Sequence, residues 1–186
     1  MGRVIIFPTD TVYGIGTQIF DIEGIERIYK IKNRPKDKPL ACLCSNINQI
    51  DDIAIIDSSA RVLINKFLPG ALTLILESKD IVKNKIGYNT IGVRIPNSKI
   101  ALNILDENGP MLTTSVNDSG EAPMNHYNEI VEKYGKLVDK IYDNDTKILE
   151  IPSTVVKIID GKIDILREGY IKKEEIEKAL NDLSCK

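Results

Sequence analysis

Apolar residues recur along the chain at two spacings, which predict alternating strands and helices. Short β-branched and apolar runs predict strands at 3–7, 40–44, 72–76 and 91–95, with another beginning at 111. Apolar residues three or four positions apart predict helices at 22–32, 58–68, 98–105, 125–134 and 172–183. We find no repeat or linker between these segments. The alternation therefore predicts one α/β layered domain over 1–186.

The clearest local signal lies near the end of the chain. Asp160-Gly161 separates two apolar runs, 152–159 and 162–166. This dipeptide favours the positive φ angles of a type I′ turn, so the two runs are predicted to form a β-hairpin.

Polar residues gather directly after the first predicted strand, in Pro8-Thr9-Asp10-Thr11-Val12-Tyr13-Gly14-Ile15-Gly16. Pro8 has no N–H for a central ladder, so we expect it to end the strand. The segment is either a tight strand-to-helix connection capped by its threonines or a turn that binds a ligand. It lacks the Gly-Lys-Ser/Thr of a P-loop and the third glycine of a dinucleotide fingerprint. Asp10 is a candidate metal ligand, although its carboxylate could equally cap the following turn.

Five cations occupy every second position from 30 to 38: Lys30, Lys32, Arg34, Lys36 and Lys38. Cations near a helix C-terminus offset the helix dipole, and a solvated charge run needs no ligand. If the segment after Pro35 is extended, however, the alternation places its charges on one side, which suits a chain of phosphates. The spacing alone leaves both interpretations open.

Two further segments carry candidate chemistry. Arg94 stands among apolar strand residues and needs a partner; it is either a surface residue or a bidentate fork for a carboxylate. Residues 113–120 place six polar side chains and a glycine after a predicted strand start, which favours a shaped turn that presents hydroxyl groups.

Composition limits the remaining alternatives. The chain has 186 residues, of which 42% are hydrophobic and 28% charged, with a net charge of −2, as expected for one globular domain rather than a polyanion platform. We see no signal peptide or membrane span, and we predict a cytoplasmic protein. Cys42, Cys44, Cys185 and His126 lack zinc-site spacing, so we predict that Cys42 and Cys44 are buried reduced thiols on one face of a strand.

Seven ordered blocks of sequence closely resemble the YrdC/TsaC family, which makes threonylcarbamoyl-AMP. They are Pro-Thr-Asp-Thr-Val-Tyr-Gly at 8–14, Lys-Asn-Arg-Pro at 32–35 followed by Lys38-Pro39-Leu40, Pro-Gly-Ala-Leu-Thr at 69–73, Gly-Val-Arg-Ile-Pro at 92–96, Thr-Ser-Val-Asn-Asp-Ser-Gly at 114–120, Ser-Thr-Val-Val at 153–156 and Leu-Arg-Glu-Gly at 166–169. The resemblance implies an α/β fold with a twisted, mixed parallel and antiparallel sheet, flanking helices and a basic concave cavity. The chain is similar in length to the single-domain members.

The same resemblance implies that L-threonine, bicarbonate and ATP react to threonylcarbamoyl-AMP and pyrophosphate. A partner threonylcarbamoyl transferase complex then modifies the adenosine beside the anticodon of tRNA. By this resemblance Thr11, Arg94, Ser115 and Ser153 contact L-threonine. Lys32, Arg34, Lys38, Thr113, Asn117 and Arg167 contact the nucleotide. Two departures put contacts in doubt, because longer relatives often carry a histidine at the position of Leu43 and a serine near that of Pro123.

The implied chemistry needs no side-chain nucleophile. Catalysis would rest on positioning and on charge neutralisation by Lys32, Arg34 and Mg²⁺ held with ATP, without a tightly bound organic cofactor. The alternative is a module that binds double-stranded RNA or tRNA without catalysis. Against it, the row of cations is not interleaved with aromatic residues, which make up only 5% of the chain. A further alternative is a carbamoyltransferase-like domain acting on another protein.

Overall fold

The computed structural model describes residues 2–144 and 148–184, and their strands form one mixed sheet. Its order is β7-β1-β2-β6-β3-β5-β4-β8-β9, in which β1 and β7, β3 and β5, and β4 and β8 pair in parallel. The strands are β1 (Ile5–Pro8), β2 (Tyr13–Gln18), β3 (Ala41–Leu43), β4 (Leu72–Glu77), β5 (Thr90–Arg94), β6 (Met111–Ser115), β7 (Lys140–Ile141), β8 (Thr154–Ile159) and β9 (Lys162–Arg167). The α/β class and the mixed sheet are as predicted.

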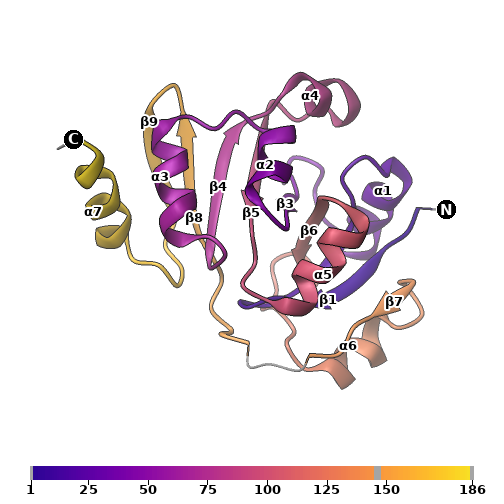
Figure 1. Cartoon of the computed structure of the whole chain (residues 1–186). Helices are drawn as coiled ribbons and strands as arrows, with labels where there is room; N and C mark the ends of the chain where they lie inside the picture. The colour runs from indigo at the N-terminus through magenta and orange to yellow at the C-terminus, as the bar shows by residue number, and fades with distance from the viewer. Residues whose placement is uncertain (1, 145–147, 185–186) are drawn as a thin grey trace.

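Seven helices of the described chain surround this sheet: α1 (Ile22–Ile31), α2 (Ile47–Ile53), α3 (Ser58–Phe67), α4 (Asp80–Ile86), α5 (Lys99–Asn108), α6 (Tyr127–Tyr134) and α7 (Lys173–Ser184). Figure 1 shows α3 and α7 near the β8–β9 end of the sheet, and α6 and β7 near the opposite end. Asp21, Asp57 and Ser98 each accept a backbone N–H at the start of α1, α3 and α5, which explains why these helices begin where they do. Within residues 2–144 and 148–184, no helix has the length and apolar character that a membrane crossing requires.

In the central strands, successive residues face opposite sides of the sheet. Cys42, Leu74 and Val93 belong to the main hydrophobic core, whereas their neighbours Ala41 and Gly92 line a cavity on the other face. A second, smaller core joins α5 to β1, β3 and β6 beside that cavity. Cys42 and Cys44 are both buried and reduced on the same side, as predicted, and burial raises the pKa of the Cys42 thiol.

Most of the sequence-based boundaries are confirmed within one or two residues, and one prediction needs correction. Pro8 ends the first strand as expected, since it is the last residue of β1, where it lies opposite Tyr13. The segment after it, however, forms a β-hairpin into β2 and is not a strand-to-helix connection. The helix expected from 125 begins at Tyr127. The Asp160-Gly161 turn is confirmed, with φ angles of 51° and 72° between β8 and β9.

Candidate active site

A cavity of about 300 Å³ opens on the face of the sheet opposite the main core. It takes residues from β2, β3, β4, β5, β6, the start of β8 and the end of β9, and from the loops that precede or follow these strands. Three arginines line it: Arg34, Arg94 and Arg167. Seven hydroxyl side chains also line it: Thr9, Thr11, Thr73, Thr90, Thr113, Thr114 and Ser153. Among the described residues the lining contains no carboxylate, so its polar groups suit a ligand that carries negative charge and hydrogen-bond acceptors.

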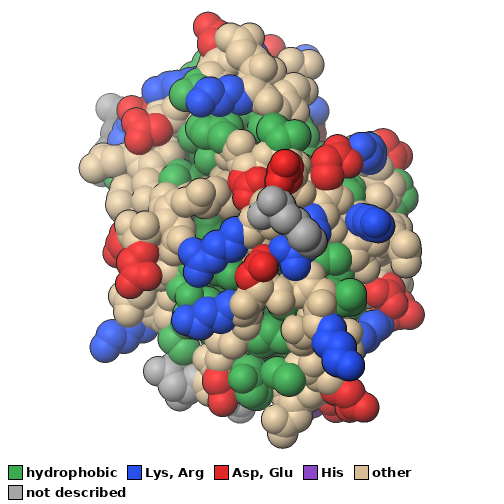
Figure 2. Space-filling model, turned by 90° about the vertical axis from the view of Figure 1, so that its right-hand side faces the viewer, with side chains coloured by type: hydrophobic (Ala, Val, Ile, Leu, Met, Phe, Trp, Pro, Cys, Tyr) green, Lys and Arg blue, Asp and Glu red, His purple; other side chains and the backbone are tan. Residues whose placement is uncertain are grey.

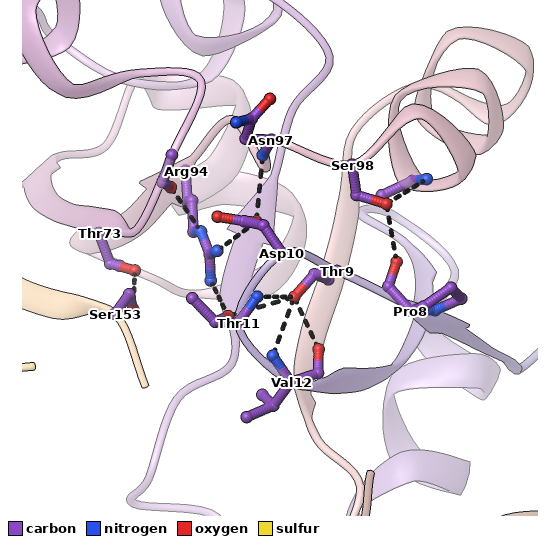
Figure 3. A network of polar contacts seen from close by, with 12 residues as sticks. Pro8, Thr9, Asp10, Thr11, Val12, Thr73, Arg94, Asn97, Ser98 and Ser153 are labelled. Carbon is purple, nitrogen blue, oxygen red and sulfur yellow. Dashed lines mark hydrogen bonds and ion pairs between the residues drawn. The ribbon is translucent and has the colours of Figure 1, made fainter. Parts of the chain in front are cut away.

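Arg94 is held at one end of this cavity by three hydrogen bonds, two of which appear in Figure 3 as dashed lines to Asp10 and Thr11. Its Nη2 lies 2.6 Å from Asp10 Oδ1, its Nη1 donates to Thr11 Oγ1 at 2.7 Å, and its Nε donates to the Gly70 carbonyl at 2.9 Å. Burial lowers the pKa of the guanidinium, and the Asp10 carboxylate opposes that shift. The partner expected for this strand arginine is therefore Asp10.

The turn that carries Asp10 is closed by its own threonine. Thr9 Oγ1 donates to the Val12 carbonyl at 2.6 Å and accepts from the Thr11 and Val12 amides (Figure 3). Asp10 Oδ1, which also accepts from the Asn97 amide at 3.0 Å, does not cap this turn. Within 2–144 and 148–184, no three acidic, histidine or cysteine side chains gather into a metal site. Asp10 as a metal ligand remains an untested prediction.

A second polar group forms close to Arg94, on the neighbouring strand β4 and at the start of β8 (Figure 3). Thr73 Oγ1 and Ser153 Oγ lie 2.8 Å apart, and Arg167 Nη2 donates to the Ser153 carbonyl at 2.8 Å. Burial lowers the pKa of Arg167. Thr73 was not predicted as a site residue. The available signal was its position between the apolar residues Leu72 and Leu74, which are buried, because a polar residue at that alternation faces away from the core.

The expected row of cations is not extended in the structure. Asn33 has a left-handed φ of 47°, which reverses the chain between Lys32 and Arg34. Arg34 therefore reaches the cavity, where its Nε donates to the Lys38 carbonyl at 2.8 Å and its Nη2 to the Pro39 carbonyl at 3.1 Å. Lys36 instead forms an exposed ion pair with Glu26, and Lys38 is exposed outside the cavity lining.

Lys32 points in the other direction, into the turn after β6. Only 1% of it is exposed, and its Nζ donates to the carbonyls of Ser115 and Asn117 and, at 3.1 Å, to Asn117 Oδ1. Burial lowers the pKa of this ammonium to about 8, and the charge of Arg34 adds to the shift. Ser115 Oγ also donates to Asn117 Oδ1, at 2.5 Å. Lys32, Ser115 and Asn117 thus form one cluster outside the residues that line the cavity.

Comparison with known proteins agrees with this architecture. The protein family described as "Telomere recombination" (Sua5/YciO/YrdC) matches residues 1–169. The chain belongs to the Sua5/YciO/YrdC family. Its members include a Methanocaldococcus jannaschii protein named putative threonylcarbamoyl-AMP synthase, which is 35% identical over 95% of this chain and 84% of its own length. Another, the Escherichia coli protein YciO, is named uncharacterized and is 31% identical over 90% of this chain and 84% of its own length.

Solved structures of the Sua5/YciO/YrdC family have the same fold. Pyrococcus abyssi Sua5 complexed with L-threonine superposes with a TM-score of 0.89 at 32% identity, over 96% of this chain and 54% of that one. E. coli YciO superposes with a TM-score of 0.84 at 30% identity, over 94% of this chain and 87% of that one. The chain therefore spans about half the length of the P. abyssi protein but most of YciO.

Proposed function

We propose that this chain is an L-threonylcarbamoyladenylate synthase, which converts L-threonine, bicarbonate and ATP to threonylcarbamoyl-AMP and pyrophosphate. The observation that carries the proposal is the buried Arg94 guanidinium at one end of a hydroxyl-lined cavity, in the fold of a relative that was solved with L-threonine. An arginine fork matches a carboxylate in geometry and charge. Several relatives at 32–35% identity are named for the same reaction.

The polar side chains that line the cavity suit two substrates. Arg94, Thr11 and Ser153 would bind the carboxylate and hydroxyl of threonine. Arg34 and Arg167 would hold the phosphates, with Thr113 beside the nucleotide. The other predicted contacts would act indirectly on substrate binding, by shaping the turn after β6. Hydrogen bonds join these three residues, Lys32, Ser115 and Asn117, in that turn. Lys38 would add charge near Arg34 from outside the lining.

The residue types fit the reaction. Threonine's amine is carboxylated, and a carbamate oxygen attacks the α-phosphorus of ATP as pyrophosphate leaves; no protein nucleophile takes part. The protein aligns the two reactants and neutralises the charge that builds on the phosphates. Mg²⁺ would arrive bound to ATP and supply further neutralisation. The product would pass to a threonylcarbamoyl transferase complex for tRNA modification in the cytoplasm.

One measurement tests the proposal against RNA binding without catalysis. On the face in Figure 2, Lys and Arg side chains are interspersed with Asp and Glu, and this mixture offers no continuous basic field there for a nucleic-acid backbone. Purified protein with ATP and Mg²⁺ should release pyrophosphate only when L-threonine and bicarbonate are both present, and mass spectrometry should detect threonylcarbamoyl-AMP. Absence of release, together with salt-dependent tRNA binding, would favour the RNA-binding alternative.

A further inference from the structure

Gly92 occupies an unusual place for a glycine, in the middle of central strand β5. It pairs with Ala41 of β3 on one side and Ile75 of β4 on the other, and it lines the cavity. Glycine weakens a strand interior, because it gains no side-chain packing and loses more backbone entropy on folding than other residues do. A glycine at this position therefore calls for a compensating reason.

The backbone does not supply that reason. Four described glycines have a positive φ, at positions 87, 109, 120 and 161, and Gly92 is not among them. A Cβ added at Gly92 would lie 3.4 Å from Thr73 Cγ2 and 3.6 Å from Ala41 Cβ, which is ordinary van der Waals contact.

Gly14, which also lines the cavity, makes the contrast clear. A Cβ added there would lie 2.6 Å from Thr113 Cγ2, so the packing of β2 against β6 excludes a side chain at that position. The protein has room for a side chain at Gly92 and has none. The absence of a side chain at Gly92 leaves this part of the cavity open.

Gly92 and Ala41 together form a flat floor. They are adjacent on neighbouring strands, about 4.8 Å apart, and neither side chain extends beyond Cβ. Thr113 borders Ala41 on one side, and Ile75 borders Gly92 on the other. Because both residues lie within paired strands, their backbone polar groups serve the sheet. The floor therefore offers mainly van der Waals contact to a ligand.

Arg94 lies two residues further along β5 on the same face, about 6.6 Å from Gly92 along the strand. The floor thus lies next to the guanidinium that suits a carboxylate. The floor itself has no charged hydrogen-bond donor. Phosphate groups need such donors, and the amino acid's polar groups match Arg94 and Thr11. A planar ring is the part of the proposed substrates that gains most from a flat, uncharged surface.

We propose that Gly92 is a specificity-determining residue, whose missing side chain leaves the floor on which the planar base of the nucleotide lies. This inference rests on the proposed function and assigns one region of the cavity to one part of ATP. Ala41 completes the floor, and a side chain larger than hydrogen at position 92 occupies space that the ring requires.

The first test fills the floor in two steps, with Gly92→Ala and Gly92→Val. We expect the apparent affinity for ATP to fall about 10-fold for alanine and further for valine, since overfilling a close-packed contact is costly. Threonine affinity should stay within about twofold, and the thermal midpoint of Gly92→Ala should equal or exceed that of the wild type. Unchanged ATP affinity in both folded variants, or a loss confined to threonine affinity, would overturn the inference.

A second measurement does not depend on turnover. Adenosine alone, titrated into labelled wild-type protein, should shift the Gly92 Hα resonances upfield by the ring current of the stacked base. Adenosine shifts that spare Gly92 and Ala41 would overturn the inference even in an active enzyme. Conversely, an upfield shift at Gly92 in a protein that releases no pyrophosphate would support the floor while rejecting the proposed reaction.

Discussion

Asp10 and Arg94 form an ion pair that is nearly withdrawn from water, with Asp10 Oδ1 2.6 Å from Arg94 Nη2 and side chains that are 12% and 7% exposed. The pair joins the turn after β1 to the end of β5, two segments that are 84 residues apart in the chain. Three of the five guanidinium N–H groups are engaged within the protein, which fixes the plane of the fork at the cavity. Asp10 therefore orients Arg94 and balances its charge.

Replacing Asp10 should show how much this pair contributes. Asp10→Ala leaves a buried guanidinium without its counter-ion, and we expect the free energy of unfolding to fall by about 3–5 kcal/mol, with weaker threonine binding. Urea denaturation and calorimetric titration with L-threonine measure the two effects. The matched control is Glu26→Ala, which breaks the exposed ion pair with Lys36 and should cost no more than about 1 kcal/mol. Equal losses of stability in the two variants would contradict this role of Asp10.

The buried Lys32 should make stability depend on pH. Burial lowers its pKa to about 8 in the folded protein, against 10.5 for an ordinary lysine. Between these values the unfolded chain binds a proton that the folded chain does not bind. Raising the pH through this window therefore increases the free energy of unfolding, by at most about 1.4 kcal/mol per pH unit, and below the window this group adds no slope.

Urea denaturation of the wild type and of Lys32→Met, at about pH 7.5 and about pH 9.5, isolates this contribution. The variant lacks the titrating group, so the wild type should gain more stability than the variant over this range. Subtracting the variant also removes the contribution of other groups, such as Tyr13, whose pKa burial raises to about 12. A stability difference between the two proteins that stays constant with pH would show that Lys32 does not titrate in this range.

Much of the fold could be predicted because its signals are local. Asp21 and Ser98 precede helices with a clear apolar period, and Asp160-Gly161 specifies its turn. The short helices α2 and α4, with seven residues each, were missed because two turns of helix carry too little periodicity. The β2 strand was missed for another reason: its glycines indicate a turn locally, and only pairing with β6 makes them strand residues.

The residues of the candidate site likewise divide into those with a local sequence signal and those whose position depends on contacts between distant segments. Arg94 and Thr11 could be identified from sequence, since a charge in an apolar strand and hydroxyls in a polar turn are local anomalies. Gly92 could not, because its place beside Ala41 depends on the register of two strands about 50 residues apart. The separation of Lys32 from Arg34 depends on the left-handed conformation of Asn33, which the alternation of charges does not encode.

Arg34 and Lys36 provide a direct test of which cation serves the reaction. They lie two positions apart in the same segment, but only Arg34 lines the cavity. If Arg34 stabilises charge in the transition state, Arg34→Ala should lower turnover by about two orders of magnitude or more. Lys36→Ala should retain nearly full turnover, measured as pyrophosphate release. Comparable losses in both variants would indicate general attraction of ATP by positive charge, without a specific role for Arg34.

Magnesium should bind with the nucleotide and not before it. Mg²⁺ prefers octahedral oxygen ligands and is commonly held by substrate phosphates and one or two carboxylates, whereas the described part of the cavity lining contains no carboxylate. Chelation of Mg²⁺ should therefore abolish pyrophosphate release, while calorimetry should detect no Mg²⁺ binding to the protein alone and clear binding once a non-hydrolysable ATP analogue is present. Asp10→Asn serves as the control, because the ion pair with Arg94 already engages this carboxylate. Tight binding of Mg²⁺ to the nucleotide-free wild type that disappears in Asp10→Asn would instead identify Asp10 as a metal ligand.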